Sequence, residues 1–323
     1  MIRFHPSTAL TLAACALWLC ACGADPSSSP AEGTTAGVGD DSSSQPSAKL
    51  QVVCTTTMIG DIVSEIAGDL ADVEVLFGPT VDPHLFRATR DDVASLLSAD
   101  LVFTNGFGLE GYLQPTLKQV KETGIDLVPI AEVILDDGEA MTDADVPDPH
   151  VWMDASLWSR LPDEVAARLA AERPGDLALP ETLKARARAV AERLTALDTY
   201  AEETLKTIPE ASRTLVTAHD AFRYFGRRYG VRVEGIQGLS TASESGLEAL
   251  ERLVDLLVDS KISAVFVEST VSDRNVKALI EGAAAQGHAV TLGGTLHSDA
   301  PGAAETYEAM MRHNVDTIAE ALR

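Results

Sequence analysis

The sequence is poor in positive charge, in long apolar runs and in cysteine. Among its 323 residues, 25 Lys and Arg stand against 49 Asp and Glu, which gives a formal net charge of -24. Because a protein that binds nucleic acid needs a basic face, this balance argues against nucleic acid as a partner. An acidic exterior attracts cations, but a solvated surface is the simpler explanation of the charge. After the first 21 residues, no apolar segment is long enough to cross a bilayer.

Cysteine is almost absent from the part of the chain that is expected to fold. Three of the four cysteines, Cys15, Cys20 and Cys22, lie near the start, and Cys54 alone remains. A single cysteine cannot form an internal disulfide, and one within an apolar run is most often a small, inert core residue. We therefore expect a core that is not held together by disulfides.

The first residues have the pattern of an export signal. Arg3 is followed by an apolar run, residues 9–19, that is too short to span a bilayer comfortably. The run ends in Leu19-Cys20-Ala21-Cys22, which resembles a bacterial lipobox, where the last cysteine becomes the N-terminus and carries acyl chains. This predicts a signal peptide over residues 1–21 and an exported lipoprotein anchored through Cys22, in the periplasm or at the outer face of the cell membrane. An ordinary secretory signal with incidental cysteines is the alternative.

The next segment, residues 22–49, is rich in Ser, Ala, Pro, Gly, Thr and Asp and has almost no bulky apolar side chain. Such a segment cannot bury enough surface to offset the entropy of ordering it, so we expect a flexible tether. The remaining residues, 50–323, are enough for two lobes of ordinary size.

Strand-like and helix-like stretches alternate through the first half of this remainder. Buried strands are predicted at residues 50–56, 73–77, 101–104 and 125–128. Helical patterns lie between them, and a longer helical stretch follows over residues 156–172. This alternation predicts a parallel sheet with helices on both faces.

A long helical stretch, residues 180–208, divides the alternation in two. It is rich in Ala, Leu, Glu and Arg, and Pro180 suits its first turn. Strands resume at residues 214–217, 231–234, 264–267 and 289–292, and a last helix is predicted over 302–322. We therefore predict an α/β protein with two lobes, residues 50–179 and 209–323, each a parallel sheet flanked by helices, joined by one long linker helix.

Two of the seven histidines occur in the same tripeptide. His84 and His150 each end an Asp-Pro-His sequence that follows a strand. The proline holds the preceding residue extended, so the histidine is presented from a stiff loop. The aspartate two residues earlier, Asp82 or Asp148, is placed to accept a hydrogen bond from the imidazole, as is common beside a bound metal. A lone histidine is more often an ordinary core or surface residue, but the repeated tripeptide favours metal ligands.

His219 and Asp299 occupy corresponding positions in the second lobe. His219 follows the strand at 214–217, and Asp299 follows the strand at 289–292. In open α/β sheets, ligands bind at the carboxyl ends of the strands. Four side chains, two from each lobe, could therefore converge on one small ion in the cleft. Taken alone, Asp299 is equally well explained as the N-cap of the last helix.

Seven short motifs extend these observations over the whole remainder of the chain. They are VDPHLF from residue 81, NGFGLEG from 105, DPHVWMD from 148, LVTAHDAFRYF from 215, IQGLST from 236, VFVEST from 265 and GGTLHSD from 293. With these motifs in this order, the chain resembles the metal-binding lipoproteins of ABC importers, the zinc and manganese solute-binding proteins whose two lobes are joined by a rigid helix. The resemblance implies that His84, His150, His219 and Asp299 are the metal ligands and that Glu268 lies beside them. On the residues alone, Glu268 can also be a surface carboxylate at a strand end.

Two positions depart from the pattern of that family. His297 stands where relatives often have tyrosine, and Pro301 stands where leucine or methionine is common. Both bear on the geometry around Asp299, and His297 is an alternative ligand. Residues 136–148 form a short acidic segment rather than a long histidine-rich loop.

The resemblance implies a monomer without catalytic activity that captures Zn²⁺ or Mn²⁺ and passes it to the permease subunits of an ABC importer. A zinc-dependent hydrolase is one alternative, but four protein ligands leave little room for the water that it needs. The sequence also has no His-Glu-x-x-His helix, nucleophile elbow or phosphate loop. A metal-independent adhesin is the other alternative, and it would leave the repeated Asp-Pro-His unexplained. Three imidazoles and a carboxylate bind zinc more tightly than manganese, but the sequence does not decide which ion is transported.

Overall fold

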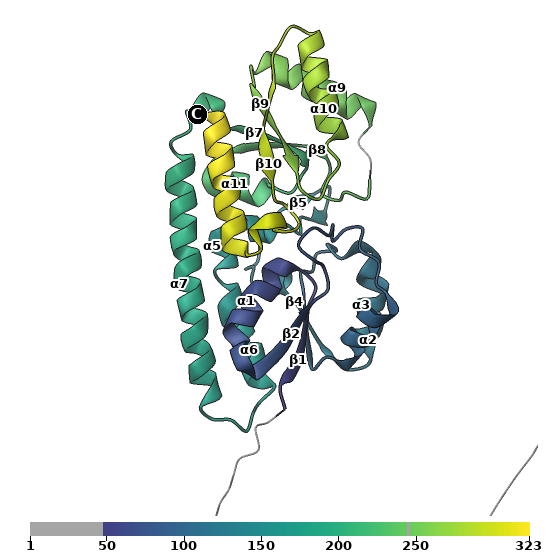
Figure 1. The fold of residues 1–323 in the computed structure, drawn as a ribbon, viewed down its shortest axis with the longest axis vertical. Coiled ribbons are helices and arrows are strands. Elements are labelled where there is room, and N and C mark those ends of the chain that lie inside the picture. Colours follow the sequence, from purple (N-terminus) through teal and green to yellow (C-terminus); the bar gives the residue numbers. More distant parts are fainter. Residues whose placement is uncertain (1–47, 244–245) are drawn as a thin grey trace, which may run out of the picture. The chain divides into compact units, whose positions relative to one another are not determined.

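The computed structural model describes residues 48–243 and 246–323, which form two lobes beside one long helix (Figure 1). The predicted signal peptide, the lipid-attachment residue Cys22 and most of the predicted tether lie outside the described residues. Within the two described ranges, no helix is long and apolar enough to cross a membrane. The lobe boundaries drawn from the sequence, 50–179 and 209–323, stay predictions.

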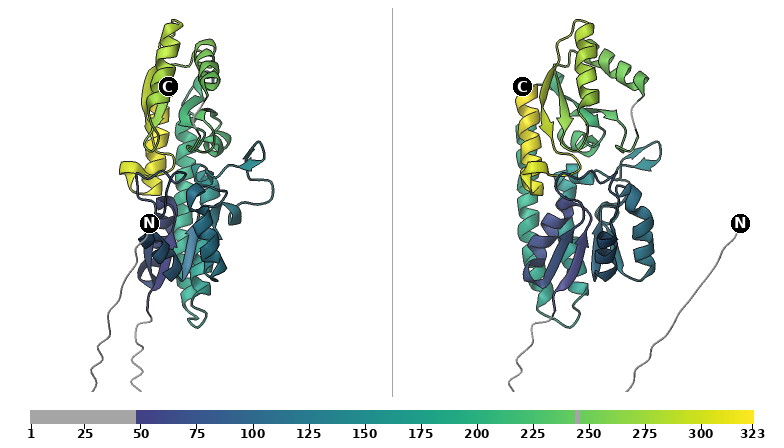
Figure 2. Two further views of the ribbon diagram at one scale, coloured as in Figure 1. Left: turned by 90° about the vertical axis from the view of Figure 1, so that its right-hand side faces the viewer. Right: turned by 45° about the vertical axis from the view of Figure 1, so that its right-hand side comes forward.

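A four-stranded parallel sheet of order β2-β1-β3-β4 forms the first lobe. Its strands are β1 (Leu50–Cys54), β2 (Ala71–Val75), β3 (Leu101–Thr104) and β4 (Asp126–Pro129). Helices α1 (Thr57–Ala67) and α6 (Leu161–Ala171) pack on one face, and α2 (Arg90–Ser98) and α3 (Gln114–Glu122) pack on the other (Figures 1 and 2). Because both faces are covered, every residue of β3 is buried.

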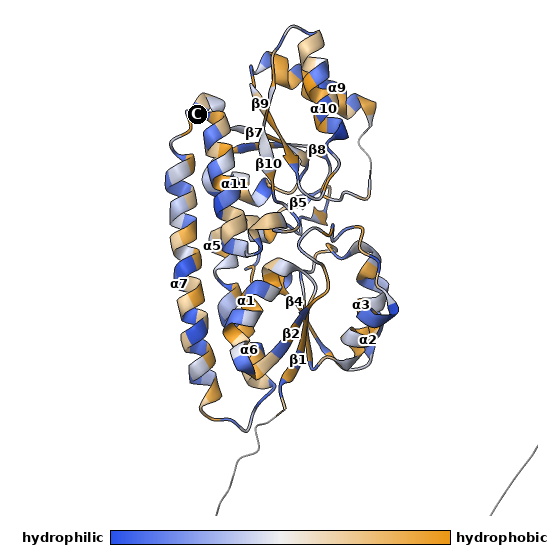
Figure 3. Cartoon of the chain, in the orientation of Figure 1, coloured by the Kyte–Doolittle hydropathy of each residue, from blue (hydrophilic) through white to orange (hydrophobic). Residues whose placement is uncertain are grey.

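Helix α7 (Leu179–Leu205) runs along both lobes (Figure 1). Its 27 residues span about 40 Å at 1.5 Å per residue. Its buried apolar side chains recur every three or four positions, at Leu183, Ala187, Val190, Leu194, Leu197, Ala201 and Leu205. This stripe packs against α1, α5 (Ala155–Trp158) and α6 of the first lobe, and the helix also contacts α8 (Arg223–Tyr229) and α11 (Tyr307–Leu322) of the second. Its remaining surface is largely hydrophilic (Figure 3). The predicted linker helix is thus attached to both lobes along its length.

Two parallel strand pairs form the sheet of the second lobe. β7 (Thr214–His219) pairs with β8 (Arg232–Gln237), β9 (Ala264–Glu268) pairs with β10 (Thr291–Leu296), and β7 lies next to β9. Helices α9 (Leu247–Asp259) and α10 (Arg274–Ala285) pack on one side, and α8 and α11 pack on the other. The predicted α/β architecture, with parallel sheets flanked by helices in both lobes, is confirmed.

Shorter elements join these parts. They are α4 (Ile130–Val133), the two-stranded antiparallel β5 (Thr142–Asp143) and β6 (Val146–Pro147), and the 3-10 turns Gly68–Leu70, Gly111–Leu113, Val151–Met153, Glu210–Ser212 and Gly302–Ala304. The small hairpin falls in the acidic segment 136–148, for which no structure was predicted. Its turn residues, Ala144 and Asp145, have positive φ angles of 45° and 70°, which the sequence does not signal.

Several predicted elements have different limits in the structure, and three of these differences have a physical reason. The helix expected over 156–172 is two helices, because Pro162 lies in the first turn of α6 and cannot donate to a preceding turn. The strand expected over 289–292 runs instead to Leu296, and Gly294, with φ 149°, absorbs a shift of its register. The last helix starts at Tyr307, capped by Thr306, so Asp299 is not the N-cap of a helix.

Candidate metal centre

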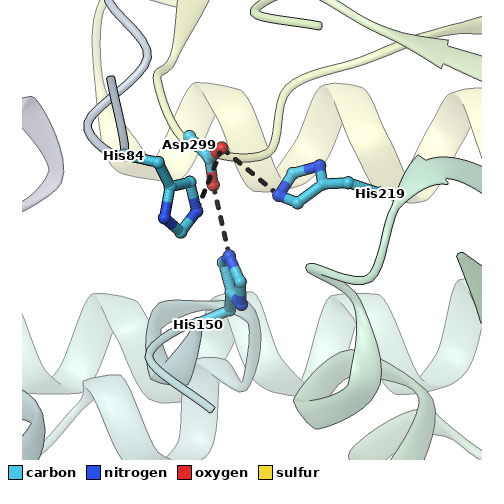
Figure 4. Close-up of side chains that lie close together, drawn as sticks. All are labelled: His84, His150, His219 and Asp299. Carbon is cyan, nitrogen blue, oxygen red and sulfur yellow. Dashed lines mark ion pairs between the residues drawn. The ribbon is translucent and has the colours of Figure 1, made fainter. Parts of the chain in front are cut away.

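Four side chains from four separate segments meet between the lobes, as Figure 4 shows. His84 lies in the loop between β2 and α2, and His150 follows β6. His219 is the last residue of β7, and Asp299 lies in the loop after β10. His219 and the loop of Asp299 thus lie at the carboxyl ends of parallel strands, which is where such sheets collect functional side chains.

Asp299 is the centre of this group. Its Oδ2 lies 3.3 Å from His219 Nε2 and 3.9 Å from His84 Nε2, and its Oδ1 lies 3.5 Å from His150 Nε2. The potential ligand atoms of the four residues all lie within 4.8 Å of one another. Tetrahedral ligands at about 2.0–2.2 Å from a metal would be separated by about 3.3–3.6 Å. The group therefore has the size of a site for one small ion.

The four side chains are buried, and the atoms that face one another lie at ion-pair distance but form no hydrogen bond. The exposed fraction is 4% for His84, 3% for Asp299 and 0% for His150 and His219. The three Nε2 atoms and both carboxylate oxygens of Asp299 lack a hydrogen-bond partner. A buried polar group without a partner costs about 1–3 kcal/mol. A divalent cation would satisfy all of these atoms at once, so the donor set fits a metal.

Two of the histidines are held by a carboxylate at the other ring nitrogen. Asp148 Oδ1 lies 2.7 Å from His150 Nδ1 and also accepts a hydrogen bond from the His150 backbone N–H at 3.0 Å. Glu268 Oε2 lies 2.6 Å from His219 Nδ1, and its Oε1 accepts from the His219 backbone N–H at 2.8 Å. A carboxylate at Nδ1 leaves Nε2 free for a metal and fixes the direction of the ring. Glu268 is 3% exposed, so the surface alternative for this residue is wrong.

Asp82 behaves differently from Asp148, although it has the same place in the tripeptide. Its Oδ1 accepts a hydrogen bond from the His84 backbone N–H at 2.9 Å, and its Oδ2 accepts from Thr241 Oγ1 at 2.7 Å. The predicted hydrogen bond from the His84 ring to Asp82 is therefore wrong, because the second oxygen is taken by a residue of the other lobe. Asp82 positions the backbone of His84 rather than its imidazole.

The charges in the site set the protonation states of the metal-free protein. Burial favours the neutral ring of His84 and lowers its pKa to about 4. Burial acts in the same direction on His150, but Asp148 and Asp299 outweigh it and raise the pKa of His150 to about 9. Glu268 and Asp299 likewise outweigh burial at His219 and raise its pKa well above the usual value.

Asp299 responds to the same neighbours in the opposite direction. Burial favours its neutral form, but the charge of His219 and the contact with His150 hold the pKa of Asp299 well below its usual range. At neutral pH the metal-free site therefore holds an ionised carboxylate, one neutral imidazole and two protonated ones.

A buried polar network holds the loop that carries His150. Asn105 Nδ2 donates a hydrogen bond to the carbonyl of Pro149 at 2.9 Å. Glu110 Oε1 accepts from the Asn105 backbone N–H at 2.5 Å and from Thr55 Oγ1 at 2.8 Å. Thr55, Asn105 and Glu110 are fully buried. None of them was assigned a role from the sequence, although Asn105, an amide directly after a buried strand, was an available signal.

A second network connects the His150 segment to the Asp299 segment. Trp152 Nε1 donates a hydrogen bond to the carbonyl of Ser298 at 2.9 Å, and Tyr307 Oη donates to the carbonyl of Trp152 at 2.6 Å. Trp152 is fully buried and Tyr307 is 1% exposed. Sequence reasoning missed this contact, since the two hydrogen-bonded residues are 146 positions apart.

The other histidines of the described ranges are not part of the group. His297, the alternative ligand, contacts Ser269 Oγ through Nδ1 at 2.9 Å and stacks on His313, with ring centroids 4.7 Å apart. His288 Nε2 contacts the carbonyl of Ile262, and His313 Nε2 contacts that of Thr295. The side chains that gather around Asp299 are thus the three histidines that the sequence analysis placed there.

Comparisons with known proteins agree with this site. The chain is similar to the manganese-binding lipoprotein MntA of Bacillus subtilis (strain 168), with 42% identity over 89% of this chain and 94% of the relative. It is also similar to the zinc-binding protein TroA of Treponema pallidum, with 39% identity over 84% of this chain and 88% of the relative. The solved structure of that periplasmic zinc-binding protein superimposes with a TM-score of 0.81 and covers 85% of this chain and 99% of that chain.

The family described as zinc-uptake complex component A periplasmic matches residues 52–321, which is nearly the whole described part of the chain. The relatives and this match cover nearly the same part of the chain, and the solved structure shares its fold. The chain therefore belongs to the ZnuA family, zinc-uptake complex component A, whose members are solute-binding proteins and not enzymes.

Proposed function

We propose that this chain captures Zn²⁺ or Mn²⁺ with His84, His150, His219 and Asp299 and delivers the ion to the permease of an ABC importer. The observation that carries the proposal is the convergence of five buried polar atoms that have no hydrogen-bond partner. Leaving these atoms unpaired is costly, and one divalent ion removes the cost for all of them. Asp148 and Glu268 support the ligands, since each lies at the Nδ1 atom of a histidine whose Nε2 faces the site.

The donor set bears on which ion is bound. Three imidazoles and one carboxylate favour zinc over manganese at equilibrium. Among the similar proteins, TroA is named as zinc-binding, two MntA lipoproteins as manganese-binding and YfeA as iron-binding. We therefore expect zinc to bind more tightly in vitro, while the ion that is carried in the cell depends on supply as well as affinity.

Export and anchoring complete the proposal. Several relatives are named as lipoproteins of metal ABC transporters. The sequence of this chain from Leu19 to Cys22 supports the same arrangement, with a diacylated Cys22 as first residue, and two acyl chains anchor a protein stably. Mass spectrometry of the native protein should find a lipidated Cys22, and an unmodified cysteine there would contradict the anchor. We further propose that the protein acts as a monomer and does not bind nucleic acid.

The experiment that tests the proposal is a metal titration. The purified metal-free protein should bind one equivalent of Zn²⁺ and compete for Mn²⁺, and its melting curve should shift upward. At free ion a thousandfold above the dissociation constant, the stabilisation should be about 4 kcal/mol. Asp299→Ala or His219→Ala should remove most of it. His313→Ala, at an exposed histidine outside the site, is the matched control and should keep it. A wild-type protein that binds neither ion in a defined ratio would overturn the proposal.

A further inference from the structure

The loop that carries His84 is linked to the facing lobe at two points: the Gly302 backbone N–H donates to the carbonyl of Pro79 at 2.8 Å, and Asp82 forms a side-chain contact close to the imidazole. Asp82 accepts from the His84 backbone N–H with Oδ1 at 2.9 Å and from Thr241 Oγ1 with Oδ2 at 2.7 Å. Thr241 lies after β8 in the second lobe, and 159 residues separate it from Asp82. A hydroxyl of one lobe thus holds, through Asp82, the backbone of a metal ligand that belongs to the other.

A cavity of about 550 Å³ adjoins this contact. Residues of both lobes line it, among them Asp82, Leu85, Gln237, Thr241, Thr270 and Arg274. Asp82 therefore faces the cavity and at the same time contacts the segment of His84. Because His84 is only 4% exposed, an ion that comes from the cavity can reach the imidazole only after the residues that cover it have moved.

Another pair of ligand segments is held much more firmly. The hydrogen bond from Trp152 Nε1 to the carbonyl of Ser298 joins the residues next to His150 and Asp299, and Trp152 is fully buried. Tyr307 Oη donates to the carbonyl of Trp152 from the same interior. Thr241, in contrast, is partly exposed at the edge of the cavity. The Trp152 contact and the Thr241 contact therefore differ in how easily water can replace them.

We propose that Thr241 is a positioning residue that holds His84 in the metal site through Asp82, and that the ion enters and leaves past this contact from the cavity. His150 and Asp299 stay together during exchange because the Trp152 contact joins their segments. His84 is the ligand that moves. The inference rests on the proposed function, since it describes how the same four-residue site opens.

The test compares variants at the edge of the cavity. Thr241→Val keeps the shape of the side chain and removes the hydroxyl, and Thr241→Ser restores the hydroxyl. Thr270→Val is the matched control, because Thr270 lines the same cavity and its Oγ1 has no hydrogen-bond partner. Zn²⁺-loaded protein is mixed with excess chelator, and release is followed by tryptophan fluorescence, since the Trp152 ring lies 5.2 Å from the His150 ring.

Loss of one hydrogen bond to a carboxylate should raise the dissociation rate by about tenfold in Thr241→Val. Thr241→Ser and Thr270→Val should release zinc at the wild-type rate, and the melting temperatures of the metal-free variants should agree. Should Thr241→Val fold poorly, Thr241→Ala carries the same expectation. The inference is overturned if Thr241→Val releases zinc as slowly as wild type, if Thr241→Ser does not restore the rate, or if Thr270→Val accelerates release equally. Failure of the wild-type protein to bind zinc would instead refute the proposed function.

Discussion

Metal binding should release about two protons from this protein near pH 8. Burial lowers the pKa of His84 to about 4, so this ring is already neutral. His150 and His219 carry protons, because nearby carboxylates outweigh burial and raise the pKa, to about 9 for His150. Each imidazole must lose its proton before Nε2 can bind a metal. One divalent ion therefore replaces two protons, and the charge of the buried site does not change.

The affinity should consequently rise steeply with pH. Each proton released multiplies the association constant by about ten per pH unit, so two protons predict about a hundredfold rise between pH 7 and pH 8. Three histidines with ordinary pKa values near ~6.5 would predict almost no rise in this window. The pH dependence of the affinity above pH 7 thus distinguishes two cases. In one, Asp148, Glu268 and Asp299 raise the pKa values of the histidines, and in the other, three histidines titrate independently.

Calorimetry in buffers of different ionisation enthalpy counts the protons directly. Asp148→Asn removes a charge that raises the pKa of His150, so this variant should release about one proton at pH 8. His313→Ala should release as many as the wild type, since His313 contacts the carbonyl of Thr295 outside the site. A wild-type protein that binds zinc at pH 8 with no proton release would refute the reasoning.

Three further predictions concern the supports of the site. The raised pKa values of His150 and His219 stabilise the metal-free protein fully below pH ~6.5, and this part of the stability is lost as the pH rises through about 9. The melting temperature of the metal-free protein should therefore fall over that pH range. A flat profile would contradict the charges described. Glu268→Gln should weaken zinc binding by about 10- to 100-fold in chelator competition, and unchanged affinity would show that this carboxylate does not support His219. Trp152→Phe leaves the buried carbonyl of Ser298 without a hydrogen-bond donor and should lower the free energy of unfolding, measured in urea, by about 1–3 kcal/mol. A smaller loss would mean that a water molecule replaces the indole N–H.

Much of the fold follows from local patterns in the sequence. The strand β3 was predicted at its observed limits, because three apolar residues and Thr104 lie between Asp100 and Asn105. The predicted start of the linker helix is one residue from the observed start, because Pro180 marks its first turn. Its predicted end is three residues from the observed end. The predicted start of the last helix, at residue 302, was wrong. Gly302–Ala304 forms a separate 3-10 turn, which ends at Glu305 with a positive φ angle.

The sequence by itself determined which side chains are available for the metal site. The repeated Asp-Pro-His and the two polar residues after strands pointed to His84, His150, His219 and Asp299, and the structure brings these four together. Only the tertiary structure decided how they are held. Asp82 and Asp148 stand in identical tripeptides, yet one contacts Thr241 and the other contacts an imidazole. The physical reason is that the choice depends on which donor the facing lobe brings within hydrogen-bond distance, and no local pattern records a partner that is 159 residues away.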